Sequence, residues 1–128
     1  MSEQTDYSKK TFLIVGTHGD DDPERAAMTF ACAGAASALG IRTSVFLTME
    51  GVKLAMKGYA ERIEPVTGMA SAKEMMDAFV KSGGIIQVCI PCLESRGIDK
   101  GQFVQGVKFV NLMDFAAQTV DADHVFTC

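Results

Sequence analysis

Short apolar runs rich in β-branched residues alternate along the chain with longer segments of helical character. The apolar runs are residues 11–15, 43–48, 85–90, 107–110 and 124–126. Runs of this length and composition are typical of buried strands. Helical patterns separate them at residues 26–39, 71–81 and 112–120. Because strands and helices alternate, the pattern predicts a parallel sheet with right-handed crossover connections.

Two of the helical segments carry recognisable start signals. Asp22 followed by Pro23 predicts an N-cap and a proline in the first helical position. Ser71 and Glu74 have the spacing of a capping box at the start of the next long helix. Shorter helical pieces are expected at residues 51–57 and 98–106.

The first long helix, residues 26–39, is apolar nearly all round and rich in alanine. A helix of this kind must be covered on more than one side. Small residues suit close approach to the sheet on one face, and Met28 and Phe30 are expected to face another subunit on the other. The pattern therefore predicts an oligomer.

Composition narrows the class of protein. The 128 residues fit one domain, predicted at residues 10–128, behind a loose polar tail at residues 1–9. Hydrophobic residues make up 48% and charged residues 22%, and the net charge of −4 offers no basic surface for nucleic acid. The start lacks the apolar centre of a signal peptide and no segment suits a membrane span. We expect a cytoplasmic protein with no nucleic-acid or membrane partner.

The segment 83–97 joins a buried strand to two of the four cysteines. Cys89 falls at the carboxyl end of the strand, which Pro91 then interrupts. Residues 92–96 can form a helical turn whose exposed N–H groups favour a thiolate at Cys92. In a chain without a secretion signal, the cysteines are expected to be thiols rather than disulfides.

The pattern Val88-Cys89-x-x-Cys92-x-x-x-Arg96-Gly97 resembles the cysteine segment of the DsrE/DsrF-like sulfur-relay proteins. The earlier strands and the Asp-Pro-Glu-Arg helix start follow in that family's order, so the resemblance spans roughly residues 10–128. It implies a three-layer α/β/α sandwich with a five-stranded parallel sheet in the flavodoxin-like order 2-1-3-4-5. It also implies that Cys89 carries sulfur as a persulfide, and that subunits form trimers or hexamers, alone or with paralogues.

In that strand order, the loops at residues 16–22 and 89–96 face each other across the crevice where open α/β sheets bind ligands. His18 is then a candidate to approach Cys89, and Arg96 is a candidate anion partner beside the cysteines. Simple solvation is the alternative for both. The acidic run at residues 20–22 is interpreted as the stabilised start of a helix rather than a cation site.

Cys92 has three candidate roles: a thiol that resolves a persulfide or forms a disulfide, a metal ligand, or a bystander. A single Cys-x-x-Cys pair gives little support for zinc, and no metal is expected. Cys32 is expected to pack in mid-helix, and nothing in the sequence orients Cys128.

The favoured function is a sulfur carrier or sulfurtransferase in which Cys89 takes sulfane sulfur and passes it on. Its partners would be sulfur-donor and sulfur-acceptor proteins or small thiols. Neither a P-loop nor a Gly-x-Gly-x-x-Gly pattern is present, and no organic cofactor is expected. The alternative is a non-catalytic oligomeric module that binds a small ligand or a partner, with incidental cysteines.

Overall fold

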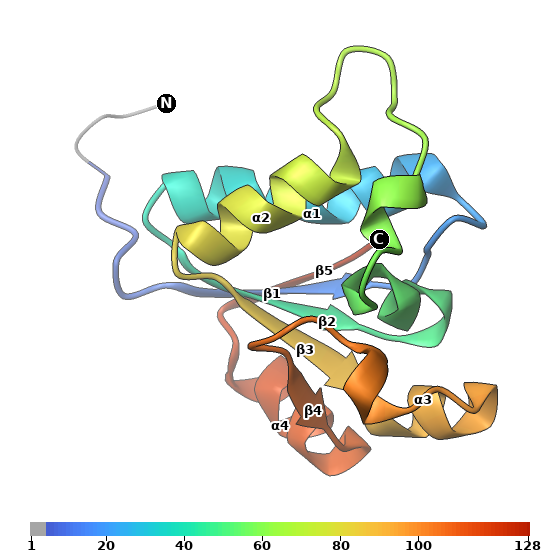
Figure 1. Ribbon diagram of the computed structural model, residues 1–128. Helices are drawn as coiled ribbons and strands as arrows, with labels where there is room; N and C mark the ends of the chain where they lie inside the picture. The colour runs from blue at the N-terminus through green and yellow to red at the C-terminus, as the bar shows by residue number, and fades with distance from the viewer. Residues whose placement is uncertain (1–4) are drawn as a thin grey trace.

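A computed structural model describes residues 5–128, which form a five-stranded, all-parallel sheet with helices on both faces (Figure 1). The strands are β1 (Thr11–Gly16), β2 (Arg42–Leu47), β3 (Ile85–Cys89), β4 (Lys108–Val110) and β5 (His124–Thr127). The α-helices are α1 (Pro23–Ala38), α2 (Ala72–Lys81), α3 (Ile90–Arg96) and α4 (Leu112–Asp121). Three short 3₁₀ helices are η1 (Met49–Ala55), η2 (Ala60–Arg62) and η3 (Lys100–Gln102). The expected α/β class and the five-stranded parallel sheet are confirmed.

The order of the strands differs from the expected 2-1-3-4-5. The sheet runs β4-β3-β2-β1-β5, so β2 lies between β1 and β3 and not at an edge. The first connections step in one direction across the sheet, which places α1 and α2 together on one face, and the return to β5 places α4 on the other (Figure 1). A sequence signal for the central place of β2 exists, because its residues 45–47 form an unbroken apolar run.

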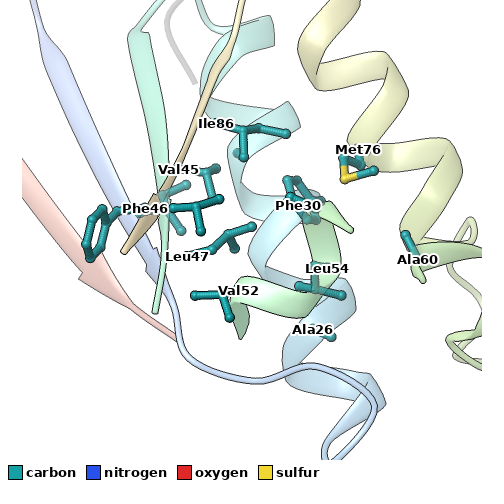
Figure 2. Close-up of a cluster of buried hydrophobic side chains, with 14 of the residues drawn as sticks. Ala26, Phe30, Val45, Phe46, Leu47, Val52, Leu54, Ala60, Met76 and Ile86 are labelled. Carbon is teal, nitrogen blue, oxygen red and sulfur yellow. The ribbon is translucent and has the colours of Figure 1, made fainter. Parts of the chain in front are cut away.

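The main core lies between the sheet and the layer formed by α1 and α2 (Figure 2). Phe30 of α1 is fully buried there, with its ring centroid 6.4 Å from that of Phe79 on α2. The expectation that Phe30 faces another subunit is therefore wrong, because it fills the core of its own chain. Met28, two residues earlier in the helix, is 41% exposed.

The opposite face of the sheet is covered by α4. Phe115 stacks on Phe46 of β2 with ring centroids 4.0 Å apart. Gln87 of β3 and Gln118 of α4 exchange two side-chain hydrogen bonds of 2.8 and 2.6 Å. Only α4 covers this face in the described part of the chain. The outer side of α4 is itself rich in exposed apolar residues.

The helix starts follow the local sequence. The Asp22 side chain accepts the N–H of Arg25, and the Ser71 hydroxyl accepts the N–H of Glu74, as predicted for N-caps. The expected loose tail, residues 1–9, lies in part outside the described residues. Within residues 5–128, no helix has the length and apolar character needed to cross a bilayer.

Candidate functional site: two cysteines at the carboxyl end of the sheet

Cys89 and Cys92 lie where β3 passes directly into α3. Cys89 is the last residue of β3 and the N-cap of α3, and only 1% of its surface is exposed. Pro91 occupies the first turn of the helix, where its missing N–H is not needed. Cys92 follows in the same turn and is half-buried, so it is the more accessible of the two sulfurs.

The segment that follows β2 holds the Cys92 sulfur. The Oγ1 of Thr48 and the backbone N of Met49 each lie 3.2 Å from Cys92 Sγ. Met49 has a φ of 52°, the left-handed region that non-glycine residues seldom adopt. Such strain often marks functional sites. Here it accompanies a backbone N–H that points at a cysteine sulfur.

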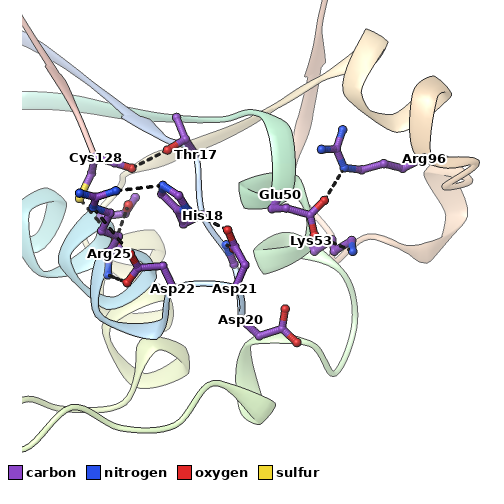
Figure 3. A network of polar contacts seen from close by, with 12 residues as sticks. Thr17, His18, Asp20, Asp21, Asp22, Arg25, Glu50, Lys53, Arg96 and Cys128 are labelled. Carbon is purple, nitrogen blue, oxygen red and sulfur yellow. Dashed lines mark hydrogen bonds and ion pairs between the residues drawn. The ribbon is translucent and has the colours of Figure 1, made fainter.

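Arg96, at the end of α3, links this helix to the same segment (Figure 3). Its Nε lies 2.8 Å from Glu50 Oε2, while Lys53 Nζ lies 2.8 Å from Glu50 Oε1. Hydrogen bonds from Lys53 and Arg96 lower the pKa of Glu50, so this carboxylate stays charged. Arg96 Nη1 also lies 3.4 Å from the carbonyl oxygen of Cys92. The predicted placement of Arg96 beside the cysteines is therefore observed.

The surroundings shift the pKa values of the two thiols in opposite directions. Burial raises the pKa of Cys89, and its hydrogen bond to Cys92 raises it further. Burial also acts to raise the pKa of Cys92, but hydrogen bonds from Thr48, Cys89 and the Met49 amide outweigh it. The positive charge of Arg96 adds to these, and the pKa of Cys92 is lowered overall. The thiolate is the nucleophilic form, so this arrangement favours Cys92 over Cys89 as the attacking sulfur.

Sequence reasoning placed Met49 in a segment that could line the crevice, but it missed Thr48, Glu50 and the contact of the Met49 amide with Cys92. With the order 2-1-3-4-5, the end of β2 would lie on the far side of β1 from β3. In the observed order β2 pairs directly with β3, which brings its following segment to Cys92. The only feature of the sequence that pointed to residues 48–50 was their position directly after a buried strand.

His18 lies in the loop after β1, and both of its ring nitrogens contact residues other than the cysteine pair. Its Nδ1 is 2.8 Å from Asp21 Oδ2 and its Nε2 is 3.4 Å from Arg25 Nη1. The prediction of a crevice between the loops after β1 and β3 is therefore wrong. The segment after β2 separates them, and the N–H of Gly51 bonds to the carbonyl of Thr17. In the described part of the chain, no three His, Cys, Asp or Glu side chains gather as metal ligands.

Fold and site together define a parallel α/β protein with a thiol pair at the end of an interior strand. The chain belongs to the DsrE/DsrF-like family, whose model matches residues 10–128. An uncharacterized protein of Methanocaldococcus jannaschii is 27% identical over 116 residues, which are 91% of this chain and 97% of that protein.

Two solved structures share the fold. The YchN protein from E. coli superposes with a TM-score of 0.77 at 20% identity, over 93% of this chain and 99% of that one. A protein of unknown function from Methanobacterium thermoautotrophicum gives a TM-score of 0.71 at 14% identity, over 96% and 100% of the two chains. At these identities the likeness establishes the fold alone.

Proposed function

We propose that this protein is a sulfur carrier or sulfurtransferase in which Cys92 receives the sulfur and Cys89 assists. The observation that carries the proposal is the Cys92 sulfur, held by the Thr48 hydroxyl and the Met49 amide, with its pKa lowered by these groups and by the neighbouring Cys89 thiol. These groups stabilise negative charge on sulfur, and membership of the DsrE/DsrF-like family is consistent with a sulfur-relay role.

The sulfur transfer needs no added oxidant. The Cys92 thiolate attacks the outer sulfur of a donor persulfide R–S–SH, which yields Cys92–S–SH and the donor thiolate R–S⁻. An acceptor thiolate then attacks the outer sulfur of Cys92–S–SH and regenerates the Cys92 thiolate. Donor and acceptor would be proteins or small thiols. Four free cysteines suit a reducing compartment, so the proposal places the protein in the cytoplasm.

Cys89 has a different role in this scheme. As a protonated, buried thiol it donates a hydrogen bond to the Cys92 sulfur. After loading, in this scheme, the Cys89 thiol attacks the inner sulfur of Cys92–S–SH, which releases hydrogen sulfide and leaves a Cys89–Cys92 disulfide. Cys89 is thus proposed to be the resolving thiol, and Arg96 to support the negative charge on Cys92.

Incubation with a small persulfide followed by peptide mass mapping tests the proposal. We expect one added sulfur on the tryptic peptide 82–96, and its removal by an acceptor thiol. This peptide contains both cysteines, and fragmentation before Pro91 assigns the added mass to Cys89 or Cys92. If neither cysteine gains sulfur, the rival interpretation of a binding module with incidental cysteines becomes the better one.

We also propose a homo-oligomer, with a trimer or hexamer as the family resemblance implies. The exposed apolar surface lies on α4, where Met113 is 84% and Val120 82% exposed. Large exposed apolar surfaces are rare on monomers. Light scattering should give a multiple of 13.7 kDa, and Met113→Glu with Val120→Glu should lower it. A 13.7 kDa species at micromolar concentration would contradict this prediction.

A further inference from the structure

Three charged side chains beside Cys92 form one group, which Figure 3 shows. The Glu50 carboxylate accepts from Lys53 Nζ and from Arg96 Nε, each over 2.8 Å. Two positive charges therefore share one negative charge, and one positive charge is left over. The exposed fractions of these side chains are 34% for Glu50, 32% for Lys53 and 27% for Arg96. A small solute can reach this group, and its surplus charge attracts anions.

The Arg96 guanidinium is held in place and keeps one nitrogen unshared. Its Nε contacts Glu50, and its Nη1 lies 3.4 Å from the Cys92 carbonyl oxygen and 3.2 Å from Ser95 Oγ. Within residues 5–128, no group accepts a hydrogen bond from its Nη2. Arginine binds carboxylates and similar anions through strong, charge-assisted hydrogen bonds. The unshared nitrogen of Arg96 is therefore placed to hold the anionic group of a ligand beside Cys92.

The positive charge of Arg96 also acts at the Cys92 sulfur, because it contributes to the lowered pKa of that thiol. The carboxylates on the same side of the loop after β1 are bonded to partners of their own. Glu50 accepts from two cations, and Asp20 accepts from the Tyr59 hydroxyl over 2.5 Å. An anion that approaches Cys92 therefore meets Arg96 as the cation with a donor to offer.

We propose that the Cys92 site selects small sulfur donors that carry an anionic group, and that Arg96 binds this group. The proposal rests on the sulfur-carrier function proposed above. The Cys92 thiolate attacks the outer sulfur of a donor ⁻O₂C–R–S–SH and forms Cys92–S–SH. The S–S bond of the donor breaks, and ⁻O₂C–R–S⁻ leaves with its electron pair. Without a cation beside it, the Cys92 thiolate would repel such a donor.

Two thiol reagents with the same leaving group and opposite charges test this preference. Sulfonatoethyl and trimethylammonioethyl methanethiosulfonate compete for Cys92 in the full chain that carries Cys89→Ala, so that Cys89 cannot displace the label. Mass mapping of the tryptic peptide 82–96 gives the ratio of the two labels. This ratio should exceed that of the neutral thiol N-acetylcysteine amide about tenfold, because the reagents differ by two charges. A ratio equal to or below that of the model thiol overturns the proposal.

Arg96→Gln should return the ratio to about that of the model thiol, because it removes the surplus positive charge. In this variant the tryptic peptide extends to Lys100. Any change in the pKa of Cys92 affects both reagents equally and cancels in the ratio. Arg42→Gln is the matched control, because Arg42 starts β2 while Thr48 follows the end of that strand. It should leave the ratio unchanged. An elevated ratio that survives Arg96→Gln contradicts the role of Arg96.

Salt supplies a second measurement that needs no variant. Raising the ionic strength from about 0.01 M to about 1 M should lower the ratio at Cys92 toward that of the model thiol at the same salt, because salt screens the charge of Arg96. A ratio that does not respond to salt contradicts an electrostatic preference. The labels report the thiol alone, whereas sulfur loading is read with a persulfide. Loading with an ordinary ratio overturns the anion preference alone, and a high ratio without loading overturns the sulfur transfer alone.

Discussion

Replacing Cys92 by serine is expected to reduce sulfur loading to background, whereas Cys89→Ala should retain it. Cys92 is the half-exposed sulfur that accepts hydrogen bonds from Thr48 and Met49, and Cys89 is buried. Cys89→Ala removes one hydrogen bond from a weak S–H donor to the Cys92 thiolate, worth about 0.5–1.5 kcal/mol, so the thiolate fraction should fall about two- to tenfold. Because each remaining thiolate is more nucleophilic, loading should slow by no more than about threefold. Mass mapping after timed exposure to a persulfide donor measures both rates.

The two variants also distinguish the roles of the sulfurs. If Cys89 is the resolving thiol, Cys89→Ala should keep its persulfide longer and form no internal disulfide. The opposite pattern, with loading lost in Cys89→Ala and kept in Cys92→Ser, would return the primary role to Cys89, as the family resemblance implied.

Thr48→Val supplies a graded control, because valine has the shape of threonine without its hydroxyl. It leaves both sulfurs in place and removes one donor to Cys92 Sγ. A hydrogen bond to a charged group is worth about 1.5–3 kcal/mol, so the thiolate fraction at neutral pH should fall at least about tenfold. Each remaining thiolate is more nucleophilic, so the net loading rate should fall by less than the thiolate fraction, but still at least about threefold. Thr43→Val, the same change near the start of the preceding strand β2 and far from Cys92, should have no effect on loading.

Gly51→Ala is expected to destabilise the fold by at least about 3 kcal/mol, because a Cβ there meets backbone and not a flexible side chain. The added atom would lie 2.2 Å from the carbonyl oxygen of Gly16 and 3.3 Å from the N of His18. Neither can move without disturbing β1. The N–H of Gly51 already bonds to the carbonyl of Thr17, which fixes this close approach.

Urea unfolding followed by circular dichroism measures the change, and Gly101→Ala is the matched control. A Cβ on Gly101 meets only Asp99 Oδ2, at 3.6 Å, which is ordinary contact. We expect Gly101→Ala to stay within about 0.5 kcal/mol of wild type. If Gly51→Ala unfolds at the same urea concentration as Gly101→Ala, the added Cβ does not clash with the Gly16 carbonyl, and the prediction is wrong.

The periodic patterns predicted the elements well because they reflect one residue and its near neighbours. The runs at 11–15 and 85–90 became β1 and β3, and Asp22 and Ser71 cap the helices as expected. The apolar run ended by Pro91 likewise placed Cys89 at the end of a strand. These features depend on local sequence, which the chain displays directly.

Strand order and the contacts that depend on it were not predictable in the same way. Nothing in the spacing of residues 43–48 says which strand lies beside them, so the roles of Thr48 and Met49 stayed hidden. The surroundings of Cys128 depend on Thr17, 111 positions away in the chain. Such contacts follow from the packing of the whole sheet and not from any one segment.

The peptide unit between Gly16 and Thr17 connects the surroundings of both thiols. The carbonyl of Gly16 accepts the N–H of Thr48, next to the Cys92 sulfur, while the N–H of Thr17 donates to the carbonyl of Cys128. An isotope label on the Thr17 amide therefore gives one spectroscopic reporter that senses both ends of the sheet's carboxyl edge. Its resonance offers a way to follow sulfur loading at Cys92 without altering any cysteine.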